Sequence, residues 1–426
     1  PKYPDHELAK AGHTVTILER SEAIGGLAGG FPFRGTYLEK AYHHIFTTDE
    51  DIISLVHELG IEDTLLWRQS SIAICKAGVT YPFTTPLDLL RFRAIPFWSR
   101  IRMGIIVFWL QHKKHWKHFI PVPAHQWMRR MCGQPAYDTV WKPLLVGKFH
   151  QFYDRVSMAW LWSRLFIRGN SKGKKGEREK LGYFKGGFQV LIATLQKTLE
   201  AKGVSIRTRV AVESIRKIEA GIAVACGDTT ETFDRLICTT PSHVLALLLK
   251  DEPSVPADYL ARLKSIDYLG AVCVIFASKQ SLSPYYWHNV VDEASPFLAC
   301  IEHTNFIEPS FYQDAHVYYL GTYVPHDHPY FTLSDEQLRE TFFASLPRIF
   351  PAFDPSQILE THIARFKNAQ HVVDCQYPEK LPPYTTPLPG VYLANFSQIF
   401  PEDRGTNFAV REGRKIAGLC LRELAH

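Results

Sequence analysis

Alternating apolar and polar positions near the N-terminus predict the second half of a βαβ unit. The segment HELAKAGHTVTILE is typical of a helix end with Ala and Leu inward, a glycine stop, and a strand over residues 14–18. Next, TTDEDIISLVHELG has apolar residues at helical spacing, a cap at Thr48 or Asp49 and a terminating Gly60. The chain is therefore expected to open with a helix, a strand and a second helix.

Strand and helix patterns also alternate in the second half of the chain. A turn at Gly186–Gly187 precedes a predicted helix over residues 188–202, and short strands follow. The segment RLICTTPSHVLALLL predicts a buried strand and then a helix that begins near Pro241. Runs of β-branched and aromatic residues over 269–323 predict a largely antiparallel sheet, and the C-terminus predicts a strand, a loop and a long helix.

Residues 86–168 differ from both halves, because their predicted helices are rich in aromatic and basic residues. One interpretation is a helical cap domain whose charges are simply solvated. The other is a pair of interfacial helices that rest on an anionic bilayer. In that second interpretation Trp98, Phe108 and Trp109 insert into the bilayer surface, and Trp116 is also expected to be exposed. The cations that would attract the anionic lipids are Arg91, Arg93, Arg100, Arg102, Lys113, Lys114 and Lys117.

Composition narrows the class of protein. With 426 residues, 46% hydrophobic and 21% charged, the chain is expected to fold as two domains. The eight scattered cysteines form no CxxC pair, and no signal peptide or spanning apolar run is visible, which predicts a cytoplasmic protein without a metal site. A formal net charge of +5 is modest, so nucleic acid is not an expected partner. The oligomeric state stays open.

The stretch VTILERSEAIGGLAGG carries the first candidate chemistry. Glu19 ends the predicted strand, where an acid can accept hydrogen bonds from a ribose, and Gly25 and Gly26 follow in a turn that can approach phosphates. The plain alternatives are a surface turn and a loop without a ligand. A phosphate-binding GxGxxG fingerprint stands about 20 residues before such an acid, which places it at or before Pro1. The chain is therefore expected to lack that turn.

Four segments in order resemble one known superfamily: the strand with Glu19, Gly25 and Gly26, the segments KGGFQVLIATL and RTRVAVESI, the strand RLICTTP, and RGTNFAVREGRKIAG. The chain resembles the FAD-dependent amine oxidase, protoporphyrinogen oxidase and phytoene desaturase superfamily. The resemblance implies an α/β fold, with a discontinuous, glutathione-reductase-like FAD-binding Rossmann domain and an inserted α+β substrate domain containing an antiparallel sheet and a helical region. The implied FAD-binding segments are 1–85, 181–250 and 386–426, the helical and membrane-facing region is 86–180, and the substrate sheet with its helices is 251–385.

The resemblance also implies roles for particular residues. Glu19 would bind the adenosine ribose, Arg20 would lie near phosphate or adenine, and the backbone of Val210 would face the adenine. Gly405, Thr406 and Asn407 would start a helix whose positive N-terminus points at the flavin. His43 and His44 are candidates for the pocket beside the flavin, and no catalytic residue is assigned. The full implied FAD-binding set is Glu19, Arg20, Gly25, Gly26, Leu27, Val210, Gly405, Thr406, Asn407 and Ala409.

The leading functional hypothesis is an FAD-dependent oxidoreductase that removes hydride from a bulky, apolar small molecule, since the aromatic helical region suits a deep apolar pocket. An alternative from another reaction class is a redox-neutral, flavin-dependent mutase of the UDP-galactopyranose mutase type. A third is a truncated, non-catalytic remnant. Substrate and electron acceptor are not fixed by the sequence, and peripheral membrane association, on the inner face, remains an expectation.

Overall fold

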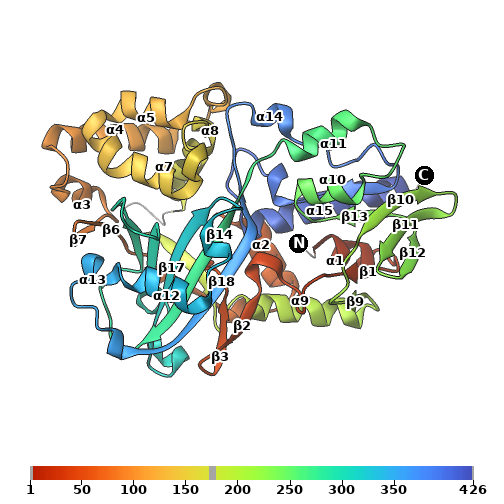
Figure 1. Ribbon diagram of the computed structural model, residues 1–426, viewed down its shortest axis with the longest axis horizontal. Coiled ribbons are helices and arrows are strands. Elements are labelled where there is room, and N and C mark those ends of the chain that lie inside the picture. The colour runs from red at the N-terminus through yellow and green to blue at the C-terminus, as the bar shows by residue number, and fades with distance from the viewer. Residues whose placement is uncertain (1–2, 172–178, 425–426) are drawn as a thin grey trace.

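The largest sheet of the computed structural model has seven strands, in the order β18–β14–β17–β16–β15–β6–β7, and lies in the left half of Figure 1. The structure describes residues 3–171 and 179–424. Neighbouring strands are antiparallel except β15 and β6, which are parallel. The strands are β6 (Ile72–Lys76), β7 (Val79–Pro82), β14 (Tyr268–Ser278), β15 (Trp287–Val290), β16 (Ala299–Glu302), β17 (His316–Val324) and β18 (Ile358–His371).

Strand β14 shows how the sequence builds this sheet, because successive side chains of a strand point to opposite faces. Val272, Val274 and Phe276 pack in one cluster with residues of α12 (Asp335–Phe343) and α13 (Leu346–Ile349). The intervening Cys273, Ile275 and Ala277 belong to a second cluster on the other side. Both faces of β14 are therefore buried, and the predicted antiparallel sheet over 269–323 is confirmed.

The other half of the molecule holds two short parallel strand pairs, which are separate sheets within the described residues. Strand β1 (Thr16–Leu18) pairs with β9 (Ser205–Arg207), and β13 (Leu236–Cys238) pairs with β19 (Val391–Leu393). Helix α1 (Tyr3–Lys10) connects them, because its Leu8 packs in the apolar clusters of both pairs. Around them lie α9 (Gln189–Ala201), α10 (Ser242–Leu248), α11 (Ala257–Lys264), α15 (Thr406–Leu424) and the antiparallel strands β10 (Ser214–Ile218), β11 (Gly221–Cys226) and β12 (Thr229–Phe233).

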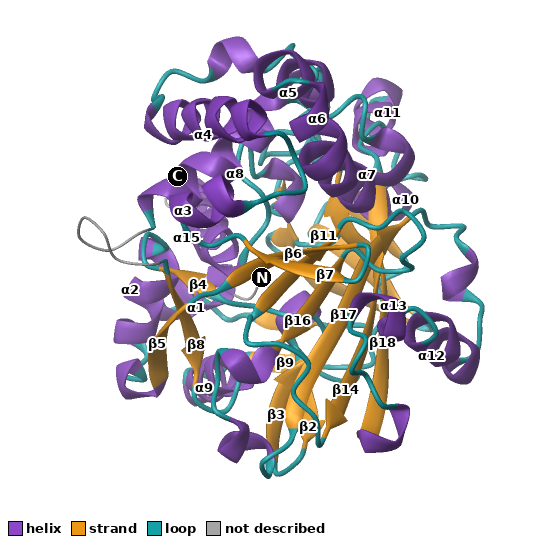
Figure 2. Cartoon of the chain, turned by 90° about the vertical axis from the view of Figure 1, so that its left-hand side faces the viewer, coloured by secondary structure: helices purple, strands orange, loops and turns teal. Residues whose placement is uncertain are grey.

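A helical lobe covers one end of the large sheet, as Figure 2 shows. Its core is aromatic, with Trp141, Phe149, Trp160 and Trp162 all buried. Trp116, expected to be exposed, instead stacks on Trp162 at a ring-centroid distance of 5.8 Å. The lobe consists of α3 (Pro86–Arg91), α4 (Phe97–His112), α5 (Ala124–Cys132), α6 (Gln134–Ala136), α7 (Lys142–Phe149) and α8 (Met158–Asn170).

Small sheets join the two halves. Strands β2 (Gly30–Phe33) and β3 (Thr36–Glu39) form a hairpin, and β8 (Lys180–Phe184) lies between β4 (Ile45–Phe46) and β5 (Leu65–Gln69). Helix α2 (Glu50–Glu58) contacts α15, and the short α14 (Tyr377–Lys380) precedes β19.

The boundaries of the segments expected from the sequence differ from the structure in two places. Strands β6 and β7, inside 1–85, belong to the large sheet, and α11, inside 251–385, packs on the cluster of β10–β12.

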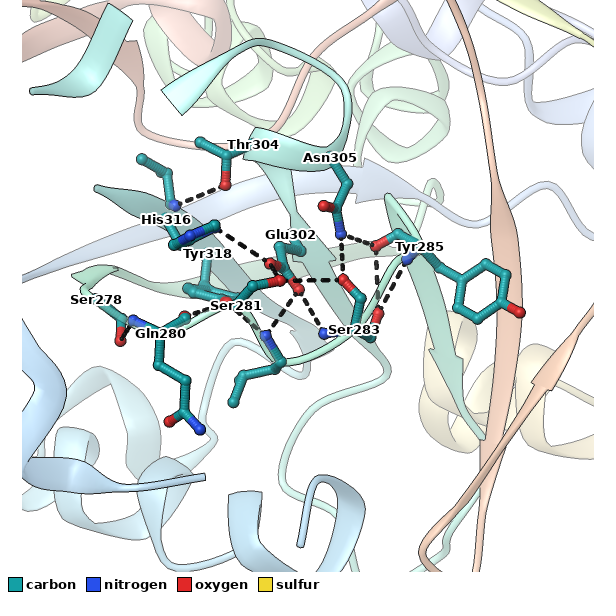
Figure 3. A network of polar contacts seen from close by, with 12 residues as sticks. Ser278, Gln280, Ser281, Ser283, Tyr285, Glu302, Thr304, Asn305, His316 and Tyr318 are labelled. Carbon is teal, nitrogen blue, oxygen red and sulfur yellow. Dashed lines mark hydrogen bonds and ion pairs between the residues drawn. The ribbon is translucent and has the colours of Figure 1, made fainter. Parts of the chain in front are cut away.

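One buried carboxylate fastens a surface loop to the large sheet (Figure 3). Glu302, fully buried at the end of β16, accepts hydrogen bonds from the Ser281 hydroxyl at 2.6 Å and from the Ser283 N–H at 3.0 Å. His316 Nδ1 lies 3.5 Å from the same carboxylate. Each of these partners is inside the sheet or its loop, so the network is structural.

Across 3–171 and 179–424, none of the helices combines the length and apolar character that crossing a bilayer requires. Over the same residues, no group of three or more His, Cys, Asp or Glu side chains is placed to hold a metal ion.

Candidate functional site

The strand-end acid and the predicted adenine contact lie next to each other. Glu19 follows β1, its N–H donates to the carbonyl of Arg207 at 2.9 Å, and its own carbonyl accepts from the Val210 N–H at 3.0 Å. The Glu19 side chain is half-buried, and its Oε1 accepts from the Ser21 N–H at 2.8 Å. The fold thus brings Glu19 and Val210 together although they are far apart in the sequence. Arg20 is exposed beside them.

The glycine turn after Glu19 needs glycine for two different reasons. Gly25 has φ +123° and Gly26 has φ +56°, both in the region that favours glycine. A Cβ at Gly25 would lie 2.8 Å from Ile192 Cδ1 and 2.9 Å from Gly29 Cα, so packing within the chain also forbids it. A Cβ at Gly26 would meet no atom within 4 Å, which leaves this exposed side of the turn bare. Leu27 follows, half-buried, in a single 3₁₀ turn.

Helix α15 begins at Thr406, as the sequence predicts, and Gly405 precedes it. The Ala409 N–H donates to the Gly405 carbonyl at 3.0 Å, which leaves the N–H groups of the first turn pointing out of the helix end. The Asn407 side chain is buried, and its Oδ1 accepts from the Ile52 N–H of α2 at 3.0 Å. The Asn407 side chain therefore fixes α15 to α2, so only its backbone is available to a ligand.

His43 and His44 lie between β3 and β4, where burial keeps both imidazoles neutral. Burial lowers the pKa of His43 to about 4, although a 2.6 Å contact of Nδ1 with the Ala41 carbonyl acts in the opposite direction. Burial also lowers the pKa of His44 to about 3, with smaller effects from the charges of Arg168 and Arg164. His44 Nδ1 is buried and has no hydrogen-bond partner among the described residues. Half-buried neutral rings of this kind can contact a ligand without adding charge.

A buried ionic cluster beside the start of α15 was not predicted from the sequence. Asp403 Oδ2 lies 2.8 Å from Lys148 Nζ of α7 and 3.4 Å from Arg164 Nη1 of α8, and Oδ1 accepts from Gln370 Nε2 of β18 at 3.1 Å. Burial alone would raise the pKa of the Asp403 carboxyl, yet the charges of Lys148, Arg164 and Arg404 hold it well below its usual value. Asp403 thus stays ionised and joins the helical lobe, the large sheet and α15.

Positive charge is in excess around this cluster. Arg404 donates to the Tyr323 hydroxyl at 3.0 Å, and Lys148 Nζ lies 5.0 Å from the centre of the Tyr323 ring. Burial alone would raise the pKa of Tyr323, but these two cations lower it. The charge of Arg404 also contributes to lowering the pKa of His43, so the predicted histidines and the unpredicted cluster adjoin. Such an arrangement favours an anionic group at this place.

Sequence reasoning missed Glu39, Lys148, Arg164 and Asp403. Glu39 ends a strand with apolar neighbours, which gives only a weak signal for a buried acid. The ion cluster joins the consecutive helices α7 and α8 to Asp403, which lies far along the chain, so its spacing in the sequence carries no signal. No spacing rule of the kind that finds metal ligands or a glycine fingerprint applies to it.

Parallel strands with a strand-end acid and a glycine turn, joined to a separate antiparallel sheet, are the architecture of a dinucleotide-dependent oxidoreductase. A sequence model of the family described as "Flavin containing amine oxidoreductase" matches residues 6–417, so the chain belongs to that family. It is therefore a flavin-dependent oxidoreductase by family, as the resemblance implied.

Relatives and solved structures agree with this family. A 15-cis-phytoene desaturase of an Oncidium hybrid cultivar is 22% identical over 421 residues, covering 91% of this chain and 70% of the relative. An Exiguobacterium sp. 255-15 structure, provisionally named a protoporphyrinogen oxidase, has a TM-score of 0.75 at 19% identity, covering 99% of this chain and 96% of that one. A reduced UDP-galactopyranose mutase has a TM-score of 0.74 at 14% identity, with 97% and 92% covered. These likenesses confirm the α/β fold expected of an FAD-binding protein.

Proposed function

We propose that the chain binds FAD across the junction between β1, the glycine turn and the start of α15. The observation that carries this proposal is the 3.0 Å hydrogen bond from the Val210 N–H to the backbone carbonyl of Glu19, which brings the strand-end acid next to the predicted adenine contact. The residues fit the cofactor in two further ways. The turn is bare at Gly26, and Gly405 is exposed at a helix N-terminus.

The chain's own residues would hold FAD as follows. Glu19 accepts hydrogen bonds from the ribose, Gly25 and Gly26 with Leu27 allow close backbone approach, and Val210 meets the adenine. The N–H groups at Thr406, Asn407 and the next residues, with Ala409 behind them, offer positive potential to the flavin ring. When bound, the flavin supplies hydride acceptance.

We propose a bulky, apolar small molecule as the substrate. The rings of His43 and His44 are neutral, and the core of the adjoining helical lobe is rich in aromatic side chains. A site with these walls excludes water and holds an apolar molecule by burial of its surface. The phytoene desaturases among the relatives carry such a substrate in their names.

The cofactor assignment is tested by Glu19→Ala. Removing the carboxylate deletes the ribose acceptor, and a hydrogen bond to a charged group contributes enough that FAD affinity is expected to fall roughly tenfold to hundredfold. Fluorescence titration of the purified chain with FAD measures this loss. Glu22→Ala is the matched control, because Glu22 lies three residues on with an 80% exposed side chain that pairs only at the surface with Arg209.

Two outcomes would contradict the proposal. Equal FAD affinity of Glu19→Ala and the wild type would show that Glu19 is merely a turn residue. A wild-type chain that takes up no flavin at all would contradict the proposed binding of FAD by these residues.

The redox-neutral mutase is the second candidate, favoured by the likeness to UDP-galactopyranose mutase. Electron balance separates the two reactions. An oxidoreductase that removes hydride must pass electrons to an acceptor at every turnover, whereas a mutase returns its flavin to the reduced state and consumes none. Acceptor consumption that scales with product formation, measured with the flavin-loaded chain, supports the oxidoreductase. Turnover without any acceptor would support the mutase.

A further inference from the structure

The outer side of α3 and α4 exposes an unusual set of large apolar side chains. We define this docking face by seven residues, which expose 40–78% of their surface: Leu87, Leu90, Phe97, Trp98, Ile105, Phe108 and Trp109. Arg100 fastens α3 to α4 by donating to the carbonyls of Leu90 at 2.7 Å and Ile95 at 2.9 Å. The two helices thus present one continuous surface at the upper left of Figure 1, away from the parallel strand pairs.

Helix α4 is apolar on two opposite sides. Met103 and Leu110 are fully buried against the lobe, as expected of a helix that packs on a core. Its solvent side carries Trp98, Ile105 and Phe108, which are 78%, 62% and 64% exposed. A surface helix normally keeps its outer side polar. A contiguous apolar surface of this kind marks a contact with something outside the chain.

Positive charge dominates around the docking face, since Asp88 of α3 already accepts hydrogen bonds from the Thr84 and Thr85 N–H groups. The segment between Asp88 and Asp138 contains no Asp or Glu. Its cations are Arg91, Arg93, Arg100, Arg102, Lys113, Lys114, Lys117, Arg129 and Arg130. Lys113 Nζ lies 4.6 Å from the centre of the Trp109 ring, so a cation and an aromatic ring are paired at the edge of the face. Lys114 and Lys117 follow and are exposed. Arg102 is exposed as well, but its guanidinium donates to the carbonyls of Arg130 and Met131 and is thereby held against α5.

We propose that the docking face binds the surface of an anionic lipid bilayer, with the aromatic and aliphatic side chains inserted at the headgroup level. Cations around the rim complement the negative lipid surface, and Trp and Phe suit the boundary between headgroups and acyl chains. A second copy of this chain fits poorly, because two such faces would bring their cations together, and Asp88 of α3 is already engaged in capping that helix. An α4 of 16 residues lies on a bilayer and does not span it. This docking stands independently of the proposed reaction.

Sedimentation with lipid vesicles tests the proposal on the full chain. Phosphatidylcholine vesicles with a third of phosphatidylglycerol are compared with phosphatidylcholine alone, each at low and high salt. We expect the chain to bind the anionic vesicles, and binding to weaken as salt rises, since exposed charges are screened beyond about 8 Å at physiological salt. Neutral vesicles should bind at least about tenfold less.

Two triple variants separate the apolar and electrostatic contributions. Trp98→Ser with Ile105→Ser and Phe108→Ser should weaken binding at least about tenfold, because inserted apolar surface is lost. Its control is Ile218→Ser with Leu247→Ser and Leu359→Ser, three exposed apolar residues elsewhere.

The second triple variant, Lys113→Glu with Lys114→Glu and Lys117→Glu, should abolish the preference for anionic lipid. Its control makes the same charge change at exposed Lys202, Lys250 and Lys264. Circular dichroism verifies that each variant folds.

Three results would overturn the proposal. The first is equal sedimentation with neutral and anionic vesicles, or none with either, at low salt. The second is vesicle binding by the apolar triple variant that matches its control. The third is a dimer in light scattering that the apolar substitutions dissolve without any vesicle binding, which would assign the face to a second copy.

Discussion

At the scale of single residues, Glu39 is an acid buried where the two halves meet. Its carboxylate, 1% exposed, accepts from the Phe188 N–H at 2.5 Å and from the Tyr183 hydroxyl at 2.7 Å. These contacts explain the glycine directly before Phe188, since a Cβ at Gly187 would lie 2.8 Å from Glu39 Oε1. Burial nevertheless raises the pKa of Glu39 to about 7, because the two donors compensate only part of the lost hydration.

This raised pKa predicts a particular pH dependence of stability. The folded chain holds a proton on Glu39 up to about pH 7, whereas the unfolded chain releases it near 4.5, so stability falls as pH rises through that window. The shift corresponds to about 3 kcal/mol in total. In Glu39→Gln this contribution is absent, so the free energy of unfolding of the variant should gain on the wild type between pH 5 and pH 8. Denaturant melts at several pH values measure the difference.

The matched control for Glu39→Gln is Glu22→Gln, a change at an exposed acid in the neighbouring region. Its stability should follow the wild type across the same pH range. Parallel curves for Glu39→Gln and the wild type would show that the buried carboxyl titrates normally, and the proton assignment would be wrong.

At the scale of elements, the start of α15 gives a test of where a ligand lies. Gly405 is exposed, and a Cβ there would meet the Phe408 ring at 3.6 Å, which is an ordinary contact. The protein itself therefore tolerates a side chain at this position. Any loss of flavin affinity on substitution must then come from a clash with the cofactor and not from misfolding.

We expect Gly405→Val to weaken flavin binding about tenfold or more while leaving the apo melting temperature within a few degrees of the wild type. If the variant still binds flavin, its reduction potential should be lower, since the helix end is held away from the ring. Gly418→Val in the same helix is the control, because its Cβ would also make only an ordinary contact, 3.7 Å from Arg422 Nη1. An unchanged affinity together with an unshifted potential would place the flavin elsewhere.

Local patterns were sufficient to predict most elements of the fold. The helix with Gly60 at its end is α2, the helix over 188–202 is α9, the helix near Pro241 is α10, and the long C-terminal helix is α15. These predictions succeeded because caps, glycines and apolar periodicity act within a few residues. The pairing of β6 with β15 was missed, because a parallel pair between residues so far apart leaves no local trace. The Asp403 cluster was missed for the same reason.

At the scale of the whole molecule, the two halves are built to very different strength. Strand β14 is paired on both sides over nearly its whole length and buried on both faces. The parallel pairs β1–β9 and β13–β19 have three residues in each strand, and they pack against helices, β1–β9 against α1 and α9 and β13–β19 against α1, α10, α11 and α15. Isolated two-stranded pairs are marginally stable in water. The large sheet should therefore be the rigid body, against which the half with the parallel strand pairs is assembled.

Hydrogen exchange followed by mass spectrometry tests this difference and links it to function. Amides of β14 and β17 should exchange most slowly, and those of β1, β9, β13 and β19 at least about tenfold faster, because short pairs open locally at lower cost. Added FAD should slow exchange in β1 and β9, since a ligand that contacts Glu19 and Val210 stabilises the closed pair. The meander β10–β12 is the internal control, because it lies in the same half but carries its own five- to six-residue ladders. Equal protection of both halves would refute the stability argument, and FAD protection confined to the large sheet would move the cofactor away from the strand ends.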